Sequence, residues 1–203
     1  MRQKINEVCL LVYPEKIPYF YLRFLIINFL ETFVMDTGTR FSKSQLTWLI
    51  ILRIFIGWHF MYEGAVKIMN PGWTSLPYLL DSQGFASSFF VRLTQNPACM
   101  HAVNLLNEWS LFVIGLALIL GCFSRLACLG GMALLLLYYV SHPSFIGANY
   151  LMPFEGSYLW IDKNLVELAA LGVLFVFPTS RIWGLDRLLV KALPAGIRKL
   201  NLN

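Results

Sequence analysis

Four long apolar stretches, separated by short polar segments, dominate this 203-residue chain. A helix needs about 20 mostly apolar residues to cross the hydrocarbon core of a bilayer, which is about 30 Å thick. The stretches at 47–69, 103–123 and 126–141 meet or approach that length, and the stretch at 165–178 does so with its flanks. Charged residues make up 13% of the chain, against about a quarter in a soluble domain. The sequence therefore predicts an all-α integral membrane protein, a four-helix transmembrane bundle.

The distribution of positive charge predicts how this bundle is oriented. A tight link around Ser124 and Arg125 joins the second and third stretches, so these helices are expected to form an antiparallel hairpin. Lys and Arg gather before the first stretch, in this link and after the last stretch, whereas the two longer loops carry only Arg92 and Lys163. By the positive-inside rule, both termini and the link are cytoplasmic, provided that residues 1–43 do not span the membrane.

Several partners and cofactors are disfavoured by the residue pattern. The net charge is +5, but Lys and Arg are scattered between apolar runs instead of forming the basic stripe that binds nucleic acid. The four cysteines form no CxxC pair and no His/Cys group with metal spacing. The chain also carries no haem ligand pair, flavin fingerprint or iron–sulfur cysteine set. The expected surroundings are a lipid bilayer, with no nucleic acid and no bound metal.

The domain organisation that we expect has three parts: an N-terminal segment at 1–43, a membrane domain at 44–190 and a basic cytoplasmic tail at 191–203. The apolar run at 17–35 contains two charged residues, which are costly inside a membrane. Three readings of the N-terminal segment stay open: an interfacial helix, a fifth span, or a non-native extension before a start at Met35.

The two longer loops are too apolar to be fully solvated. Between 73 and 93 the dense apolar residues predict short amphipathic helices on the outer membrane surface or folded over the bundle. The loop at 141–163 is expected to be a structured cap, because it combines glycines and prolines with several aromatic residues.

The first apolar stretch carries four polar residues on one helical face, namely Arg53, His59, Glu63 and Lys67. Glu63 is four residues from both His59 and Lys67, the spacing at which side chains on a helix touch. A carboxylate between an imidazole and an ammonium group can keep its charge and relay a proton to a redox-active ligand. Alternatively, the group is a structural salt bridge near the interface, where Lys67 can snorkel. Both readings stay open.

Polar residues at the starts of the second and fourth stretches are expected at the same outer depth as this group, with His142 beside them. The predicted outer pocket brings these together with aromatic walls from Trp58, Phe60, Tyr62 and Trp109, a mixture that suits a quinone head group. Alternatively, Glu108 and Glu167 are favoured by the helix dipole, and the Trp residues are interface anchors. The predicted catalytic residues are Glu63, Lys67 and His59; the predicted ligand-binding residues are Arg53, Trp58, Asn104, Glu108, Trp109, His142, Lys163, Asn164 and Glu167.

Four segments carry a resemblance to a known family: Arg53 to Lys67, Gly115 to Arg125 (GLALILGCFSR), Lys163 to Glu167, and Trp183 to Asp186. On these residues the chain resembles the DoxX family over roughly 44–190. That family includes the small membrane subunit of thiosulfate:quinone oxidoreductase. The resemblance implies a four-helix bundle of the bacterial inner membrane, sometimes with a second subunit, that passes electrons from a sulfur substrate to quinone.

Competing functions stay open beside this quinone-dependent oxidoreductase subunit. The main alternative is a non-enzymatic membrane scaffold or accessory protein for a periplasmic redox or stress-response partner. A small-solute transporter is disfavoured because the chain shows no inverted repeat. A homo-oligomer is compatible with each of these functions.

Overall fold

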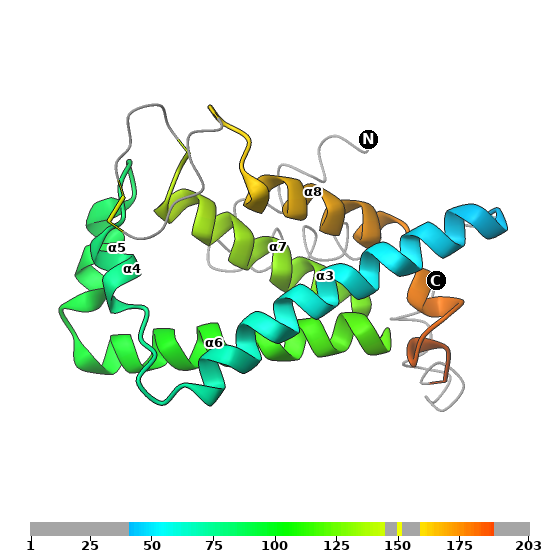
Figure 1. The fold of residues 1–203 in the computed structure, drawn as a ribbon, viewed down its shortest axis with the longest axis horizontal. Helices are drawn as coiled ribbons and strands as arrows, with labels where there is room; N and C mark the ends of the chain where they lie inside the picture. The colour runs from blue at the N-terminus through cyan, green and yellow to red at the C-terminus, as the bar shows by residue number, and fades with distance from the viewer. Residues whose placement is uncertain (1–40, 145–149, 152–158, 189–203) are drawn as a thin grey trace, which may run out of the picture. The chain divides into compact units, whose positions relative to one another are not determined.

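The structure, a computed structural model, describes residues 41–144, 150–151 and 159–188. Every regular element in these residues is helical (Figure 1), and no strand occurs among them. The predicted all-α class is therefore confirmed. The elements are α3 (Lys43–Met69), α4 (Leu76–Leu80), α5 (Ser87–Thr94), α6 (Pro97–Leu120), α7 (Ser124–Ser141), α8 (Lys163–Val176) and the 3-10 helix η2 (Thr179–Arg181).

Two predicted parts of the chain fall largely outside the described residues. The N-terminal segment is described only from residue 41 and the predicted tail at 191–203 not at all. Most of the predicted cap at 141–163 also lies outside them. The described helices all belong to one compact unit.

Local capping residues explain where the long helices begin. At the start of α3, the Ser42 hydroxyl accepts from the Gln45 backbone N–H at 3.2 Å, and the Gln45 side chain accepts from the Ser42 backbone N–H at 2.9 Å. At the start of α6, Asn96 accepts from the Ala98 backbone N–H at 2.9 Å, and Pro97 occupies the first helical position. Because of this cap, α6 begins six residues before the predicted span.

The helices α3, α6 and α7 are long and apolar enough to cross a membrane. The chain is a multi-pass membrane protein. Helix α8 has 14 residues, which corresponds to about 21 Å at 1.5 Å per residue, less than the core of a bilayer. The predicted stretch at 165–178, itself short for a full span, is present as a helix that begins and ends two residues earlier, at Lys163 and Val176, ahead of Pro178 and η2.

The hairpin of the second and third helices is present, but its link lies at residues 121–123 and not around Ser124 and Arg125. Gly121 ends α6 in the left-handed region, with φ of +64°, where glycine is favoured. Ser124 is already the first residue of α7. This short connection makes α6 and α7 antiparallel.

Helix α3 packs mainly against α6, and α7 packs mainly against α8. Two glycines allow the first pair to approach closely. A Cβ atom on Gly64 would collide with the backbone of Phe112, and one on Gly115 would collide with the backbone of Met61. Small residues of this kind let membrane helices pack backbone to backbone. The buried core comprises Ile56, Phe60, Leu111, Leu118, Ala127, Cys128, Leu135, Leu171 and Leu174.

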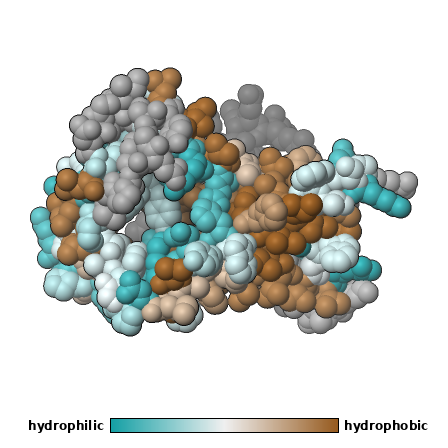
Figure 2. Space-filling view, viewed as in Figure 1, coloured by the Kyte–Doolittle hydropathy of each residue, from teal (hydrophilic) through white to brown (hydrophobic). Residues whose placement is uncertain are grey.

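Many large apolar side chains remain exposed on the helices, among them Phe55 of α3 and Leu116 of α6. In Figure 2 the apolar side chains gather in a band over the central and right part of the view, with hydrophilic side chains on both sides of it. An exposed apolar band between polar ends is the surface that a bilayer covers.

The helices have two ends that differ in their connections, visible at the left and right of Figure 1. The loop end is where α3 finishes and α6 begins, joined by residues 70–96 with α4 and α5. The predicted short helices between 73 and 93 are thus present. The hairpin end is where residues 121–123 join α6 to α7, beside η2.

Candidate functional site

The hairpin end holds one buried charge, the guanidinium of Arg53. Its Nη1 donates to the Thr179 hydroxyl at 3.0 Å, and its Nη2 donates to the Trp183 carbonyl at 2.7 Å. Both partners follow α8 and lie more than 120 residues away in the chain. Arg53 therefore ties α3 to the segment after α8, and it does not join the other polar residues of α3.

Asp186 completes the hairpin end by capping α7. Its carboxylate accepts from the backbone N–H groups of Phe123, at 2.7 Å, and Ser124, at 3.4 Å. The first N–H groups of a helix lack partners within the helix, so an acid placed there stabilises the helix start. The Asp186 backbone N–H also donates to the Gly121 carbonyl at 2.9 Å. Hydrogen bonds thus tie the two halves of the hairpin end together, although Arg53 Nε and the Ser124 hydroxyl are buried without a hydrogen-bond partner among the described residues.

The loop end contains an imidazole–carboxylate pair between α3 and α8. His59 Nδ1 lies 2.8 Å from Glu167 Oε1. The His59 side chain is 52% exposed, whereas that of Glu167 is 14% exposed. The sequence spacing predicts that His59 contacts Glu63, but its hydrogen bond is with Glu167. A histidine held by a carboxylate can take up and release a proton at the ring nitrogen that the carboxylate does not hold.

Glu63 and Lys67 form the second polar contact of the loop end, as their spacing predicts. Lys67 Nζ lies 3.7 Å from Glu63 Oε2, and the Lys67 side chain is 17% exposed while that of Glu63 is 50% exposed. The ammonium group also lies 5.2 Å from the centre of the Trp73 ring, a cation–π contact. The lysine is thus enclosed, and the carboxylate is open on one side.

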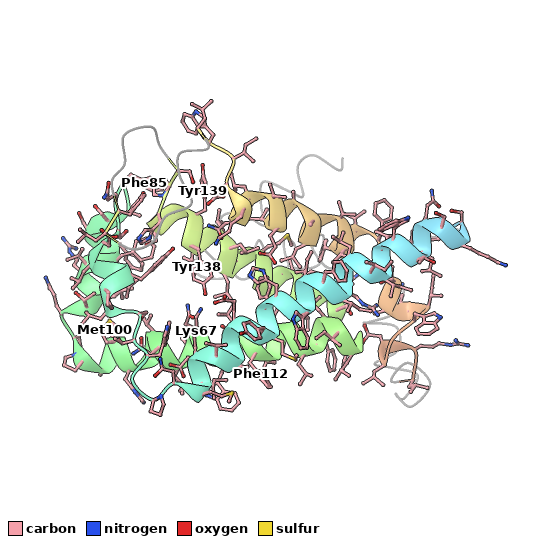
Figure 3. All side chains as sticks on the ribbon, viewed as in Figure 1. Lys67, Phe85, Met100, Phe112, Tyr138 and Tyr139 are labelled. Atoms are coloured by element: carbon pink, nitrogen blue, oxygen red, sulfur yellow. The ribbon has the colours of Figure 1, made fainter. Side chains whose placement is uncertain are left out.

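A chain of hydrogen bonds connects Lys67 to α6 and α7. Lys67 Nζ donates to Asn107 Oδ1 at 3.2 Å, and Asn107 Nδ2 donates to the Tyr138 hydroxyl at 2.7 Å. In Figure 3 the side chains of Lys67 and Tyr138 point toward each other across the space between α3 and α7. We name His59, Glu63, Lys67, Asn107, Tyr138 and Glu167 the loop-end polar cluster. It combines a proton-exchanging pair with several hydrogen-bond donors.

His142 lies beside this cluster in an aromatic setting of its own, directly after α7. Its ring stacks on Tyr78 at 3.8 Å between centres and lies 4.7 Å from Tyr150. Its Nδ1 is 3.1 Å from the Ser141 hydroxyl oxygen. Burial lowers the pKa of His142 below its ordinary value, although Asp81 acts in the opposite direction. Burial also raises the pKa of Tyr78. The neutral form of His142 is therefore favoured.

The other predicted ligand-binding residues do not gather in one ring. Asn104 accepts from the Ser75 backbone N–H and hydroxyl, at 3.0 and 2.6 Å, and so holds the loop onto α6. Asn164 donates to the Asp162 carboxylate at 2.8 Å. Trp58 and Trp109 are exposed on the helix surfaces, and Phe60 belongs to the buried core, so these rings do not together floor an interior pocket.

The structure does not support the alternative that Glu108 and Glu167 are favoured by the dipoles at the starts of their helices. Because α6 begins at Pro97, Glu108 lies in its fourth turn, beyond the reach of the helix dipole at its end. The residue that caps α8 is Asp162, which accepts from the Leu165 backbone N–H at 3.0 Å. Glu167 lies beyond this first turn and instead contacts His59. Lys163 is exposed at the start of α8.

Several residues of both ends were not singled out as site residues from sequence. Asn107 and Tyr138 look like ordinary helix and interface residues until the neighbouring helix is known. Thr179 follows a proline in a short polar segment and gives no periodic signal. Asp186 does carry a signal, because it is the last residue of the Trp183 to Asp186 segment that resembles the DoxX family. That segment supplies Arg53 with its carbonyl partner and α7 with its cap.

No group of three or more His, Cys, Asp or Glu residues suitable for a metal ion occurs in the described part of the chain. The donor set of the loop-end polar cluster is an ammonium group, an amide, a phenol and an imidazole. The same cluster holds the carboxylates of Glu63 and Glu167, so it offers both hydrogen-bond donors and acceptors.

Comparison with known proteins supports the resemblance to the DoxX family. The DoxX family model matches residues 48–143, a range that runs from α3 through α7. It includes five members of the loop-end polar cluster, all except Glu167 of α8. No curated protein and no solved structure matches the chain. The family resemblance predicted from the sequence is confirmed.

Proposed function

We propose that this chain, whose residues 48–143 match the DoxX family model, is a quinone-interacting redox subunit of a bacterial inner membrane. In this proposal the loop-end polar cluster binds the quinone head group. The observation that carries the proposal is the hydrogen bond between His59 and Glu167, which leaves half of the imidazole exposed on α3, a helix long and apolar enough to cross a membrane. A hydrogen-bonded histidine presented at that depth is costly unless a ligand uses it.

The residues of the cluster have complementary tasks in this proposal. A bound quinone supplies an acceptor for two electrons and two protons. Lys67 is held by Asn107 and donates a further N–H to a carbonyl oxygen of the ligand, since an ammonium group has three donors. Glu63, open on one side and 3.7 Å from Lys67, is a carboxylate that relays a proton from solvent to the same oxygen. His59 and Glu167 hold a second proton at the other edge of the cluster.

The electrons come from outside the described residues in this proposal. A reduced sulfur compound or a partner subunit is the donor that the family resemblance implies. The loop end faces the periplasm in the orientation that the positive-inside rule predicts, because Arg125, Arg181 and Arg187 lie at the hairpin end. The donor would therefore reach the cluster from the side of α4 and α5.

The experiment that tests the proposal replaces Glu63 by Gln, which removes the carboxylate that can relay a proton and keeps the size of the side chain. We expect thiosulfate-dependent reduction of decylubiquinone in membranes to fall by at least about 100-fold, in the range of a lost general acid–base group. The unfolding temperature in detergent should change little, because the Glu63 side chain is half exposed.

Asp81→Asn is the matched control, since Asp81 lies at the loop end but outside the cluster, where it accepts from the Leu151 backbone N–H. This variant should keep the quinone reductase rate. An unchanged rate in Glu63→Gln would remove Glu63 from the mechanism. Loss of rate in both variants would indicate general damage to the loop end.

A second candidate function is a membrane scaffold for a periplasmic partner. The observation that favours it is the exposed apolar surface of the loop-end connection, where Leu80, Phe85 and Phe89 are all exposed. In that case the polar cluster only fixes the positions of the helices. Glu63→Gln would then lower the unfolding temperature and change no reaction rate, and the protein should purify together with its partner.

A further inference from the structure

Tyr138 is the member of the loop-end polar cluster that is placed most firmly. It lies one turn before the end of α7, and its hydroxyl oxygen is 2.7 Å from Asn107 Nδ2 on α6. Its backbone carbonyl accepts from the Tyr78 hydroxyl of α4 at 3.3 Å. Contacts from two different elements thus hold both the side chain and the backbone of this residue.

The direction of the hydrogen bond to Tyr138 follows from the chemistry of its neighbours. An ammonium group can only donate, so the side of Asn107 that contacts Lys67 must be its carbonyl oxygen. The amide NH2 group must then face Tyr138, where it donates to the phenol oxygen. Lys67 therefore sets the orientation of Asn107, and Asn107 makes the Tyr138 oxygen an acceptor.

This arrangement leaves one donor directed elsewhere. The hydroxyl hydrogen of Tyr138 has no acceptor within hydrogen-bond distance among the described residues. A donor that is partly shielded from water costs free energy when it has no partner. In Figure 3 the ring of Tyr138 points into the same space as the Lys67 ammonium group. Two donors, from α3 and α7, therefore face one region.

We propose that the Tyr138 hydroxyl, positioned by Asn107, donates a hydrogen bond to a carbonyl oxygen of the ligand in the loop-end polar cluster. This inference rests on the proposed quinone-binding function and adds a ligand-recognising residue to it. Tyr138 contacts the ligand, whereas Asn107 acts through Tyr138 and is a positioning residue. The ligand atom follows from these two donors, the Lys67 ammonium group and the Tyr138 hydroxyl, because donors pair with an acceptor oxygen.

The first test replaces Tyr138 by Phe, which removes only the hydroxyl group. We expect the dissociation constant of decylubiquinone to rise about tenfold, as for one lost hydrogen bond to a ligand. The infrared carbonyl stretch of 13C-labelled quinone should move to higher wavenumber, because one carbonyl loses its donor. Tyr139→Phe is the matched control, since the Tyr139 hydroxyl donates to the Trp160 carbonyl at 2.9 Å instead.

The second test replaces Asn107 by Asp. A carboxylate has no N–H group to donate to Tyr138, so the phenol would turn and donate its hydrogen to the new oxygen. Lys67 would keep an acceptor, and the protein should unfold at a temperature close to that of the wild type. Asn107→Asp should therefore reproduce the weaker quinone binding and the carbonyl shift of Tyr138→Phe although the hydroxyl group is present.

The results distinguish failure of the role of Tyr138 from failure of the proposed quinone-binding function. Wild-type affinity and an unshifted carbonyl band in Tyr138→Phe would overturn the role of Tyr138, and quinone binding by the wild type would still support the proposed function. If the wild-type protein binds no decylubiquinone, both ideas fail. If Tyr138→Phe binds weakly but Asn107→Asp binds as the wild type does, the positioning role of Asn107 is wrong.

Discussion

The two ends of the helices carry similar residue types but use them differently. At the hairpin end, the Arg53 guanidinium donates to a hydroxyl and a carbonyl, and the Asp186 carboxylate accepts two backbone N–H groups. At the loop end, His59 and Glu63 each make a single charged contact and are half exposed. Closed polar groups stabilise a fold, whereas polar groups that stay open toward a membrane are costly and indicate a function.

The hairpin end should lose the most stability when its charge is removed. In Arg53→Met, the Thr179 hydroxyl and the Trp183 carbonyl lose their donors inside the protein. Because the Thr179 hydroxyl is buried and the Trp183 carbonyl is partly buried, and an unpaired buried group costs about 1–3 kcal/mol, we expect the free energy of unfolding to fall by about 2 kcal/mol. Chemical unfolding in detergent measures this change.

Arg92→Met is the control for that variant, because Arg92 is exposed on α5. Its effect should stay within about 0.5 kcal/mol, the usual range for surface substitutions. Equal losses in the two variants would mean that the buried contacts of Arg53 contribute no more to the free energy of unfolding than an exposed arginine does.

At the loop end, His59→Gln should lower activity much more than stability. Glutamine can still donate to Glu167, and the replaced side chain is half exposed, so the free energy of unfolding should fall by less than about 1 kcal/mol. Quinone reduction should fall at least about 100-fold, because an amide does not act as an acid or a base near neutral pH. A stability loss as large as that of Arg53→Met would show that both ends are structural.

The smallest effect concerns His142, which lies next to the loop-end polar cluster. Its pKa is lowered by burial among Tyr78 and Tyr150, so the unfolded chain takes up a proton at higher pH than the folded protein does. Stability should therefore be greatest above about pH 6.5, the ordinary pKa of histidine, and should fall as the pH decreases toward the lower folded value.

The unfolding temperature measured between pH 5 and 8 checks this sign. The comparison is between wild type and His142→Phe, because the phenylalanine ring can keep the stacking and cannot be protonated. As the pH falls below 6.5, the unfolding temperature of the wild type should fall relative to that of His142→Phe. A constant difference would mean that the proton on His142 has no effect on stability.

Much of the membrane architecture could be predicted because apolar periodicity is a local property. The three long helices lie close to their predicted positions, and the short helices between 73 and 93 are present. The errors occurred where a cap or a proline decided an element boundary. Asn96 and Pro97 start α6 early, and Asp162 caps α8 so that this helix begins and ends two residues before the predicted stretch at 165–178.

The polar contacts could be predicted only in part. The contact of Glu63 with Lys67 follows from a spacing of four residues within one helix. The contacts of His59 with Glu167 and of Arg53 with Thr179 span more than 100 residues. Such pairs depend on how the helices rotate and pack, which no spacing along the chain expresses.

The sequence by itself determined that this chain is a helical membrane protein, where its long helices lie and which face of α3 carries charge. It also indicated the family. Only the tertiary structure divided the charged residues between a closed hairpin end and an open loop end. The physical reason is that helix formation and membrane burial depend on neighbouring residues, whereas the partner of each buried polar group depends on helix packing, including the close α3–α6 approach at Gly64 and Gly115.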